Sequence, residues 1–203
     1  MKSLMWKTFY RWLKTKELNI VYLGPPLAGK HANLRHLQAL ALQEFGVKSS
    51  TTNELILEGS QLLPLLGMDS ALVGMQPIEF RIQTIPISTY RDPVRDDLLR
   101  SMDAAVMVFD SQRGRMDSNA AINWNLKSWM INLNRDMSAI PQVIQYNKRD
   151  FPRLETIEVL EQRLNPQQLP YVEASASKGV GVTETLRILV EKLVPSAVTS
   201  QAR

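Results

Sequence analysis

The sequence predicts an α/β domain in which a mostly parallel sheet is flanked by helices on both faces. Two observations support this fold class. Short apolar runs alternate along the chain with longer segments whose apolar residues recur at helical spacing. The 203 residues, 44% hydrophobic and 22% charged, are enough to form one full core. We therefore expect a single domain over 18–194, preceded by an N-terminal segment over 1–17 and followed by a flexible tail over 195–203.

The apolar runs predict strands and the periodic segments predict helices. The first strand ends at Gly24, and the continuous apolar run 104–109 suits a central strand covered on both faces. Residues 46–60 are polar and are interpreted as a loop. The other expected strands lie at 62–66, 77–85, 142–146 and 171–173, and the expected helices at 30–43, 118–134, 154–164 and 181–193.

Composition excludes several kinds of site. The chain has no Cys and only two His, which excludes a disulfide framework, a thiolate metal site and a cysteine nucleophile. We expect no metal held by the chain's own side chains, and no catalytic residue stands out, because neither a Ser/His/Asp motif nor a paired-carboxylate motif is present. No uncharged apolar stretch is long enough to span a bilayer, and the expected location is the cytoplasm.

The positive charge is concentrated at one end of the chain. The net charge is +4, yet the first 16 residues carry five basic residues and no acidic one, which leaves 19 basic and 20 acidic residues in the rest. A protein that binds nucleic acid usually spreads Lys and Arg over one face of its fold. We therefore expect no nucleic-acid partner.

The basic N-terminal segment also carries large apolar residues at helical spacing, and it predicts a basic amphipathic helix over 1–17. Such a helix can contact an anionic membrane surface through residues 1–16, dock on a protein partner, or pack back onto its own domain. The first alternative would place the protein at the periphery of the inner membrane. The apolar residues are Met5, Trp6, Phe9, Trp12 and Leu13.

A phosphate-binding motif, G-x-x-x-x-G-K, stands between the first expected strand and the first expected helix. Its glycines allow a tight loop whose N–H groups face phosphates, and the Lys reaches the outer ones. The next position normally holds a Ser or Thr that binds Mg²⁺, but here it is His31, a poor ligand for that cation. Mg²⁺ is therefore a doubtful cofactor. The expected phosphate-binding residues are Gly24, Pro25, Leu27, Ala28, Gly29, Lys30, His31 and Ala32.

A second motif, N-K-x-D, follows the strand expected at 142–146. Asn147 can tie the two loops together, the Lys148 stem can cover a base, and the Asp150 carboxylate can accept two hydrogen bonds from the edge of guanine. Adenine offers no matching donors there. A helix cap after a strand is the alternative interpretation of these residues. Ser175, Ala176 and Ser177 follow the next strand and could offer a backbone N–H to the guanine carbonyl.

These two motifs resemble those of small Ras-like GTPases, and more narrowly of the bacterial MglA-like group, over about residues 18–194. The resemblance implies a Ras-like G domain, bound GTP or GDP, a role in cell polarity or gliding motility, and protein partners that include roadblock-fold regulators. The shared pieces include Asn33-Leu34, Asp110-Ser111-Gln112, the string Gln145-Tyr146-Asn147-Lys148-Arg149-Asp150, and Gly179-Val180-Gly181-Val182.

The departures from this group fall around the γ-phosphate. The group carries T-V-P-G-Q where this chain has Thr84-Ile85-Pro86-Ile87-Ser88, so Ile87 replaces a Gly and Ser88 replaces a Gln. An Arg of the first switch is also missing. Three hypotheses follow: a guanine-nucleotide-binding protein with weak or absent hydrolysis, an active GTPase completed by a partner, or a nucleotide-free scaffold. The candidate switch residues are Thr51, Thr52, Pro86, Ile87 and Ser88.

Overall fold

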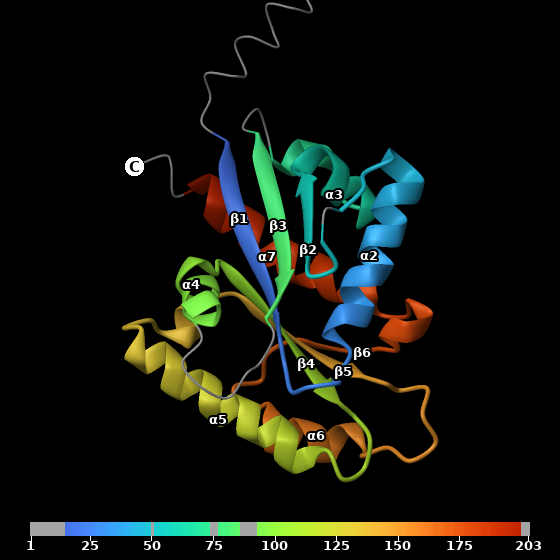
Figure 1. Ribbon diagram of the computed structural model, residues 1–203, viewed down its shortest axis with the longest axis vertical. Helices are drawn as coiled ribbons and strands as arrows, with labels where there is room; N and C mark the ends of the chain where they lie inside the picture. Colours follow the sequence, from blue (N-terminus) through green and yellow to red (C-terminus); the bar gives the residue numbers. More distant parts are fainter. Residues whose placement is uncertain (1–14, 50, 74–76, 86–92, 200–203) are drawn as a thin grey trace, which may run out of the picture.

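The computed structural model describes residues 15–49, 51–73, 77–85 and 93–199 (Figure 1). Six strands form one sheet in the order β2-β3-β1-β4-β5-β6. Neighbouring strands are parallel except for the antiparallel pair β2 and β3. The strands are β1 (Lys16–Leu23), β2 (Glu54–Glu58), β3 (Ile78–Thr84), β4 (Ala104–Asp110), β5 (Gln142–Asn147) and β6 (Tyr171–Glu173).

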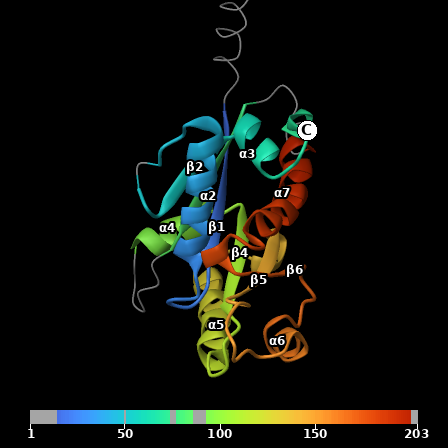
Figure 2. The ribbon, with the colours of Figure 1, turned by 90° about the vertical axis from the view of Figure 1, so that its right-hand side faces the viewer.

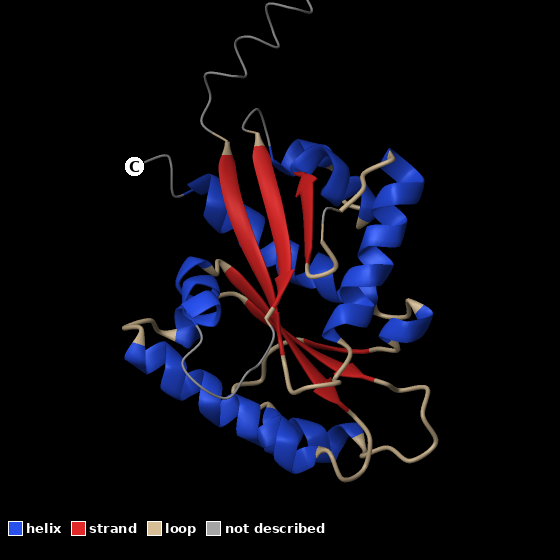
Figure 3. Ribbon diagram, in the orientation of Figure 1, coloured by secondary structure: helices blue, strands red, loops and turns tan. Residues whose placement is uncertain are grey.

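Helices lie on both sides of this sheet (Figures 2 and 3). One hydrophobic core joins the sheet to α2, α3 and α7, and a second joins the opposite face to α4, α5 and α6. This arrangement confirms the α/β fold class. The helices are α2 (Lys30–Phe45), α3 (Gly59–Leu65), α4 (Pro93–Ser101), α5 (Met116–Asn132), α6 (Ile157–Leu164) and α7 (Val182–Thr199), with 3₁₀ turns η1 (Ser70–Val73), η2 (Met137–Ala139) and η3 (Ala176–Lys178).

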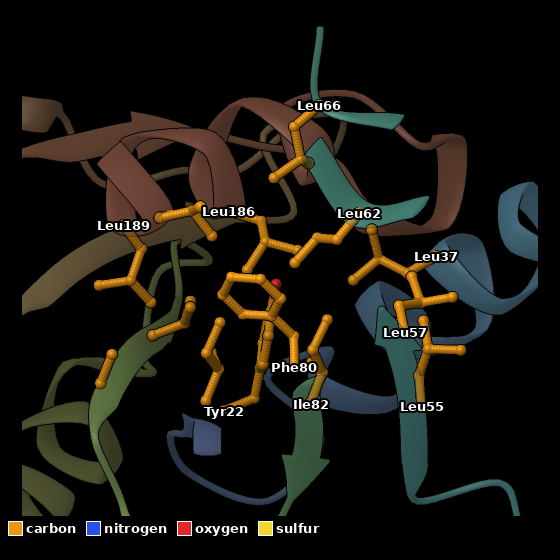
Figure 4. Close-up of a cluster of buried hydrophobic side chains, with 14 of the residues drawn as sticks. Tyr22, Leu37, Leu55, Leu57, Leu62, Leu66, Phe80, Ile82, Leu186 and Leu189 are labelled. Atoms are coloured by element: carbon orange, nitrogen blue, oxygen red, sulfur yellow. The ribbon is translucent and has the colours of Figure 1, made fainter. Parts of the chain in front are cut away.

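The first core forms because three helices place Leu side chains on the same face of the sheet. Phe80 of β3 lies among Leu62 of α3 and Leu186 of α7 (Figure 4), and all three are fully buried. Burial of each such side chain stabilises the fold by about 1.5–3 kcal/mol. This core fixes α2 against the sheet and so sets the position of the loop that precedes it.

Buried and partly exposed side chains alternate strictly along β2 and β3. In β3 the odd-numbered residues from 79 to 83 are partly exposed, and the intervening residues are buried. Glu79 lies opposite Glu17 of β1 and opposite Glu58 of β2. Three carboxylates therefore form a row across three strands, on the face away from the first core.

Two of the expected elements are wrong. Residues 62–66, expected as a strand, belong mostly to helix α3, and residues 54–58 of the expected loop form strand β2. Glu58 accepts from the backbone at the third helical position, while the Gln61 side chain accepts from the Glu58 N–H, so the pair forms a capping box. Leu62, Leu63 and Leu66 then fall on one buried side of a helical turn.

The expected segment boundaries also shift. Strand β1 begins at Lys16, so the last two residues of the expected N-terminal helix are strand, while residues 1–14 lie outside the described residues. Helix α7 continues to Thr199, which makes part of the expected flexible tail helical. Helix α6 begins at Ile157 rather than near 154. Within the described ranges, no helix is long and apolar enough to cross a membrane.

Candidate nucleotide-binding site

Three loops meet at the carboxyl ends of the parallel strands, which is where open α/β sheets bind ligands. One runs from β1 into α2, one follows β5, and one runs from β6 into η3. Together they contain the predicted phosphate-binding and guanine-binding residues.

The loop between β1 and α2 depends on its two glycines. Gly24 has φ +148° and Gly29 has φ +106°, both in the region that favours glycine. A Cβ at Gly24 would lie 2.1 Å from the Val108 carbonyl oxygen, and one at Gly29 would lie 2.0 Å from Nδ2 of Asn147. Leu27, at the tip, also has a positive φ of 64° and is 79% exposed. The loop is therefore tightly wrapped and packed against its neighbours.

Lys30 begins helix α2 and turns its side chain back into this loop. Its Nζ donates to the carbonyl oxygens of Gly24 and Pro25 at 2.8 Å each, and the residue is only 5% exposed. Burial lowers the pKa of this amino group to about 8. The N–H groups of the first helical turn have no partner within the helix, so this end of α2 favours an anion.

Asn147 joins all three loops. Its Nδ2 donates to the Ala28 carbonyl at 2.7 Å, and its Oδ1 accepts from the Ala176 N–H at 2.9 Å. The side chain is almost fully buried, as are Ala28 and Ala176. A buried amide that satisfies a carbonyl and an N–H on two other loops fixes their separation.

Lys148 is held in place by an acidic residue that the motif alone does not include. Its backbone has φ +66°, and its Nζ donates to Oδ2 of Asp110 at 2.8 Å and to Oε1 of Gln112 at 3.3 Å. Asp110 is buried at the end of β4 and also lies 3.7 Å from the Arg115 guanidinium. The sequence analysis gave Asp110 and Gln112 only as pieces shared with a family. Their place directly after a buried strand was the available signal.

Asp150 carries the carboxylate that would read a base. The Ser175 hydroxyl, and after it the Lys178 ammonium 3.5 Å away, hold the pKa of this carboxyl below its usual range. The group is thus ionised near neutral pH, as an acceptor of two N–H donors must be. Ser175 and Ala176 are buried beside it, whereas Ser177 is exposed. Nothing in the sequence around Lys178 indicates this ion pair with Asp150.

A buried amide network behind the site was also missed. Asn33 of α2 and Gln145 of β5 exchange two hydrogen bonds, of 2.7 and 2.9 Å, and Gln145 also donates to the Thr185 hydroxyl at 3.0 Å. All three residues are fully buried. Asn33 further donates to the Gly29 carbonyl at 3.1 Å, so the phosphate loop is tied to β5 at a second point.

The described residues predicted for the γ-phosphate side are exposed, unlike Asn147 and Ser175 at the base side. His31 is exposed, and its Nε2 lies 2.9 Å from Oδ1 of Asn53. Thr51 and Thr52 precede that residue and are exposed. Pro86, Ile87 and Ser88 lie outside the described residues. The hydroxyl of Thr84, at the end of β3, is buried and has no hydrogen-bond partner among the described residues.

The side chain at the position that normally binds Mg²⁺ does not match the oxygen ligands that this cation prefers. The eighth motif position offers an imidazole nitrogen already engaged by Asn53, and the Asp110 carboxylate is engaged by Lys148. Within the described part of the chain, no group of three His, Asp or Glu residues could hold a metal ion.

The phosphate loop after β1, the Asn-Lys-Arg-Asp loop after β5 and the sheet order define a P-loop protein with a Ras-like G domain. No family model matches the chain. It is 35% identical over 187 residues to the mutual gliding-motility protein MglA of Myxococcus xanthus (strain DK1622), which covers 89% of this chain and 92% of that protein. The chain therefore belongs to the MglA-like family of small Ras-like GTPases, and guanine-nucleotide binding is implied by that membership.

Proposed function

We propose that this protein binds GDP and GTP, hydrolyses GTP weakly or not at all, and acts by binding partners. One observation carries the proposal: the base-reading loops are joined by the buried Asn147 side chain, while the position that should hold the metal ligand is His31, bonded to Asn53. The first half of this contrast supports binding. The second half supports weak hydrolysis.

The argument on hydrolysis follows from what phosphoryl transfer needs. The reaction depends on a positioned water, a metal and groups that stabilise charge in the transition state. Here the hydroxyl at the metal position is replaced by His31, and Ser88 stands where the family has its water-positioning Gln. The loss of both groups would slow turnover without removing the pocket for the base.

The proposed cellular role rests on similarity to a named relative. The relative is a mutual gliding-motility protein, and we propose a role in motility or cell polarity for this chain as well. A regulator of the roadblock fold is the candidate protein partner.

Peripheral membrane contact through residues 1–16 is a second candidate interaction. It predicts that the full chain sediments with anionic liposomes and that Lys7→Glu with Arg11→Glu abolishes this.

Two other functions remain as alternatives. An active GTPase completed by a partner would show phosphate release only when a partner supplies a missing group, such as an Arg in trans. A nucleotide-free scaffold is favoured by one contact, because the Lys30 ammonium already has two carbonyl partners within its own loop. Such a protein would bind neither nucleotide.

The test is titration of fluorescent GDP and GTP, with phosphate release measured in parallel. Lys30→Ala should lower GDP affinity at least 100-fold, or about 2.7 kcal/mol, because a charged phosphate loses its buried cationic partner. Lys127→Ala, at an exposed position on α5, is the matched control and should bind as wild type does. Turnover by the protein alone would contradict weak hydrolysis, and absence of any binding would favour the scaffold.

A further inference from the structure

The exposed contact between His31 and Asn53 joins two segments that a metal joins in a typical P-loop GTPase. His31 is the first residue after Lys30 in α2, and Asn53 is the last residue before β2. Their side chains meet at 2.9 Å between Nε2 and Oδ1. In a typical P-loop GTPase, the hydroxyl at the position of His31 binds Mg²⁺, and Mg²⁺ with the γ-phosphate orders the first switch.

A second residue of α2 holds the same segment two helical turns further along. Gln38 donates to the carbonyl oxygens of Thr51 and Glu54 at 2.9 Å each. The Ser49 hydroxyl donates to the same two carbonyls. Positions 31 and 38 lie on one side of the helix because seven residues make almost two turns. The segment 51–54 is thus attached to α2 at both ends.

Asn53 also connects this segment to β3, the strand that precedes the candidate switch residues Pro86, Ile87 and Ser88. Its carbonyl oxygen accepts from the Thr84 N–H at 3.0 Å, at the last residue of β3. Asn53 therefore bonds to α2 through its side chain and to β3 through its backbone. Neither bond involves a phosphate or a metal.

We infer that the hydrogen bond between His31 and Asn53 replaces the divalent cation as the link between the phosphate loop and the first switch segment. The inference rests on the proposed function for its nucleotide part. The segment 51–54 is then held in one position in every nucleotide state. Guanine nucleotide binds without a requirement for Mg²⁺, because the cation has no structural link to complete.

The structural part is tested by hydrogen–deuterium exchange on the full chain, without nucleotide. The Thr84 N–H donates to the Asn53 carbonyl, so His31→Ala should speed exchange of the Thr84 amide about three- to tenfold, the effect of losing one hydrogen bond that holds Asn53. His31→Gln keeps an N–H donor at the end of the side chain and should restore slow exchange. Gln43→Ala, exposed on the same helix, is the matched control and should exchange as wild type does. Unchanged exchange in His31→Ala overturns the inference.

The nucleotide part is tested by titrating fluorescent GDP with Mg²⁺ and then with EDTA. Wild-type affinity should differ less than threefold between the two conditions. A loss of tenfold or more in EDTA overturns the inference. Absence of binding under both conditions overturns the proposed function instead, and the exchange experiment still decides whether the bond holds the segment.

Discussion

The two ends of the site differ in how their residues are held. At the base end, Asn147 and Ser175 are nearly inaccessible, and Asn147 bonds to two other loops. At the γ-phosphate end, His31 and Thr51 are exposed, and segment 51–54 is held by side chains from α2. At the first end, the side chain that joins the loops lies in the protein core, although Asp150 itself is exposed. The second end lies on its surface.

This difference separates a buried anchor from an exposed one. Buried hydrogen bonds are costly to break, because each leaves an unsatisfied group behind, whereas exposed ones can exchange with water. Loops joined by the buried Asn147 side chain are positioned before any ligand arrives. A surface segment is stable only by the sum of its few contacts, so its position is sensitive to a single substitution.

The largest effect that would test this comparison is expected at Asn147. Asn147→Ala removes two buried bonds and leaves the Ala28 carbonyl and the Ala176 N–H without partners. We expect a loss of about 4 kcal/mol in the free energy of unfolding, measured by urea denaturation. Asn132→Ala, exposed at the end of α5, should change it by less than about 0.5 kcal/mol. A small loss at Asn147 would mean that the base end is no better anchored than the switch.

An intermediate effect is expected from pH, through Lys30. Its pKa is about 8 in the folded protein against 10.5 ordinarily, because of burial. Between these values the unfolded chain holds a proton that the folded protein has lost, so stability rises with pH across this window. Without nucleotide, the unfolding free energy of the wild type, measured relative to that of Lys30→Met, should rise by up to about 3 kcal/mol across this pH window. Below pH 7 the difference between the two proteins should not change with pH. A flat difference throughout would show that Lys30 is solvated.

The smallest effect is expected at the switch end. Gln38→Ala removes two hydrogen bonds, one of them exposed, from the segment 51–54. We expect a loss of about 1 kcal/mol, visible as a fall of a few degrees in Tm. A loss as large as that at Asn147 would remove the distinction between the two ends.

The sequence was sufficient for most of the fold, because apolar strands such as 104–110 and the motif loops leave strong local patterns. It was insufficient for α3, because a short run of Leu residues fits a buried strand as well as a buried helix. Only the capping pair Glu58 and Gln61 indicates the helix. The strand β2 was missed because Ser and Thr before it favoured a loop over the whole segment.

The sequence predicts residues of the candidate site only where they lie close together along the chain in a motif of fixed spacing. The phosphate loop is contiguous, so its residues could be named in advance. The partner of Lys148 is Asp110, 38 residues away, and the partner of Asn33 is Gln145, 112 residues away. Nothing local in a single sequence pairs such residues, because the sheet topology brings them together.

The row of carboxylates across β1, β3 and β2 bears on self-association. Strand β2 lies at the edge of the sheet, spans five residues and has Glu54 and Glu58 at its ends. A strand from another molecule would pair about 4.8 Å away and place its side chains beside this negative charge. Short, charged edge strands resist such pairing. Within one molecule the Arg81 guanidinium offsets this charge, because it pairs with Glu54 at 2.8 Å and with Glu79 at 3.5 Å, while the charged edge protects the sheet from joining that of a second copy.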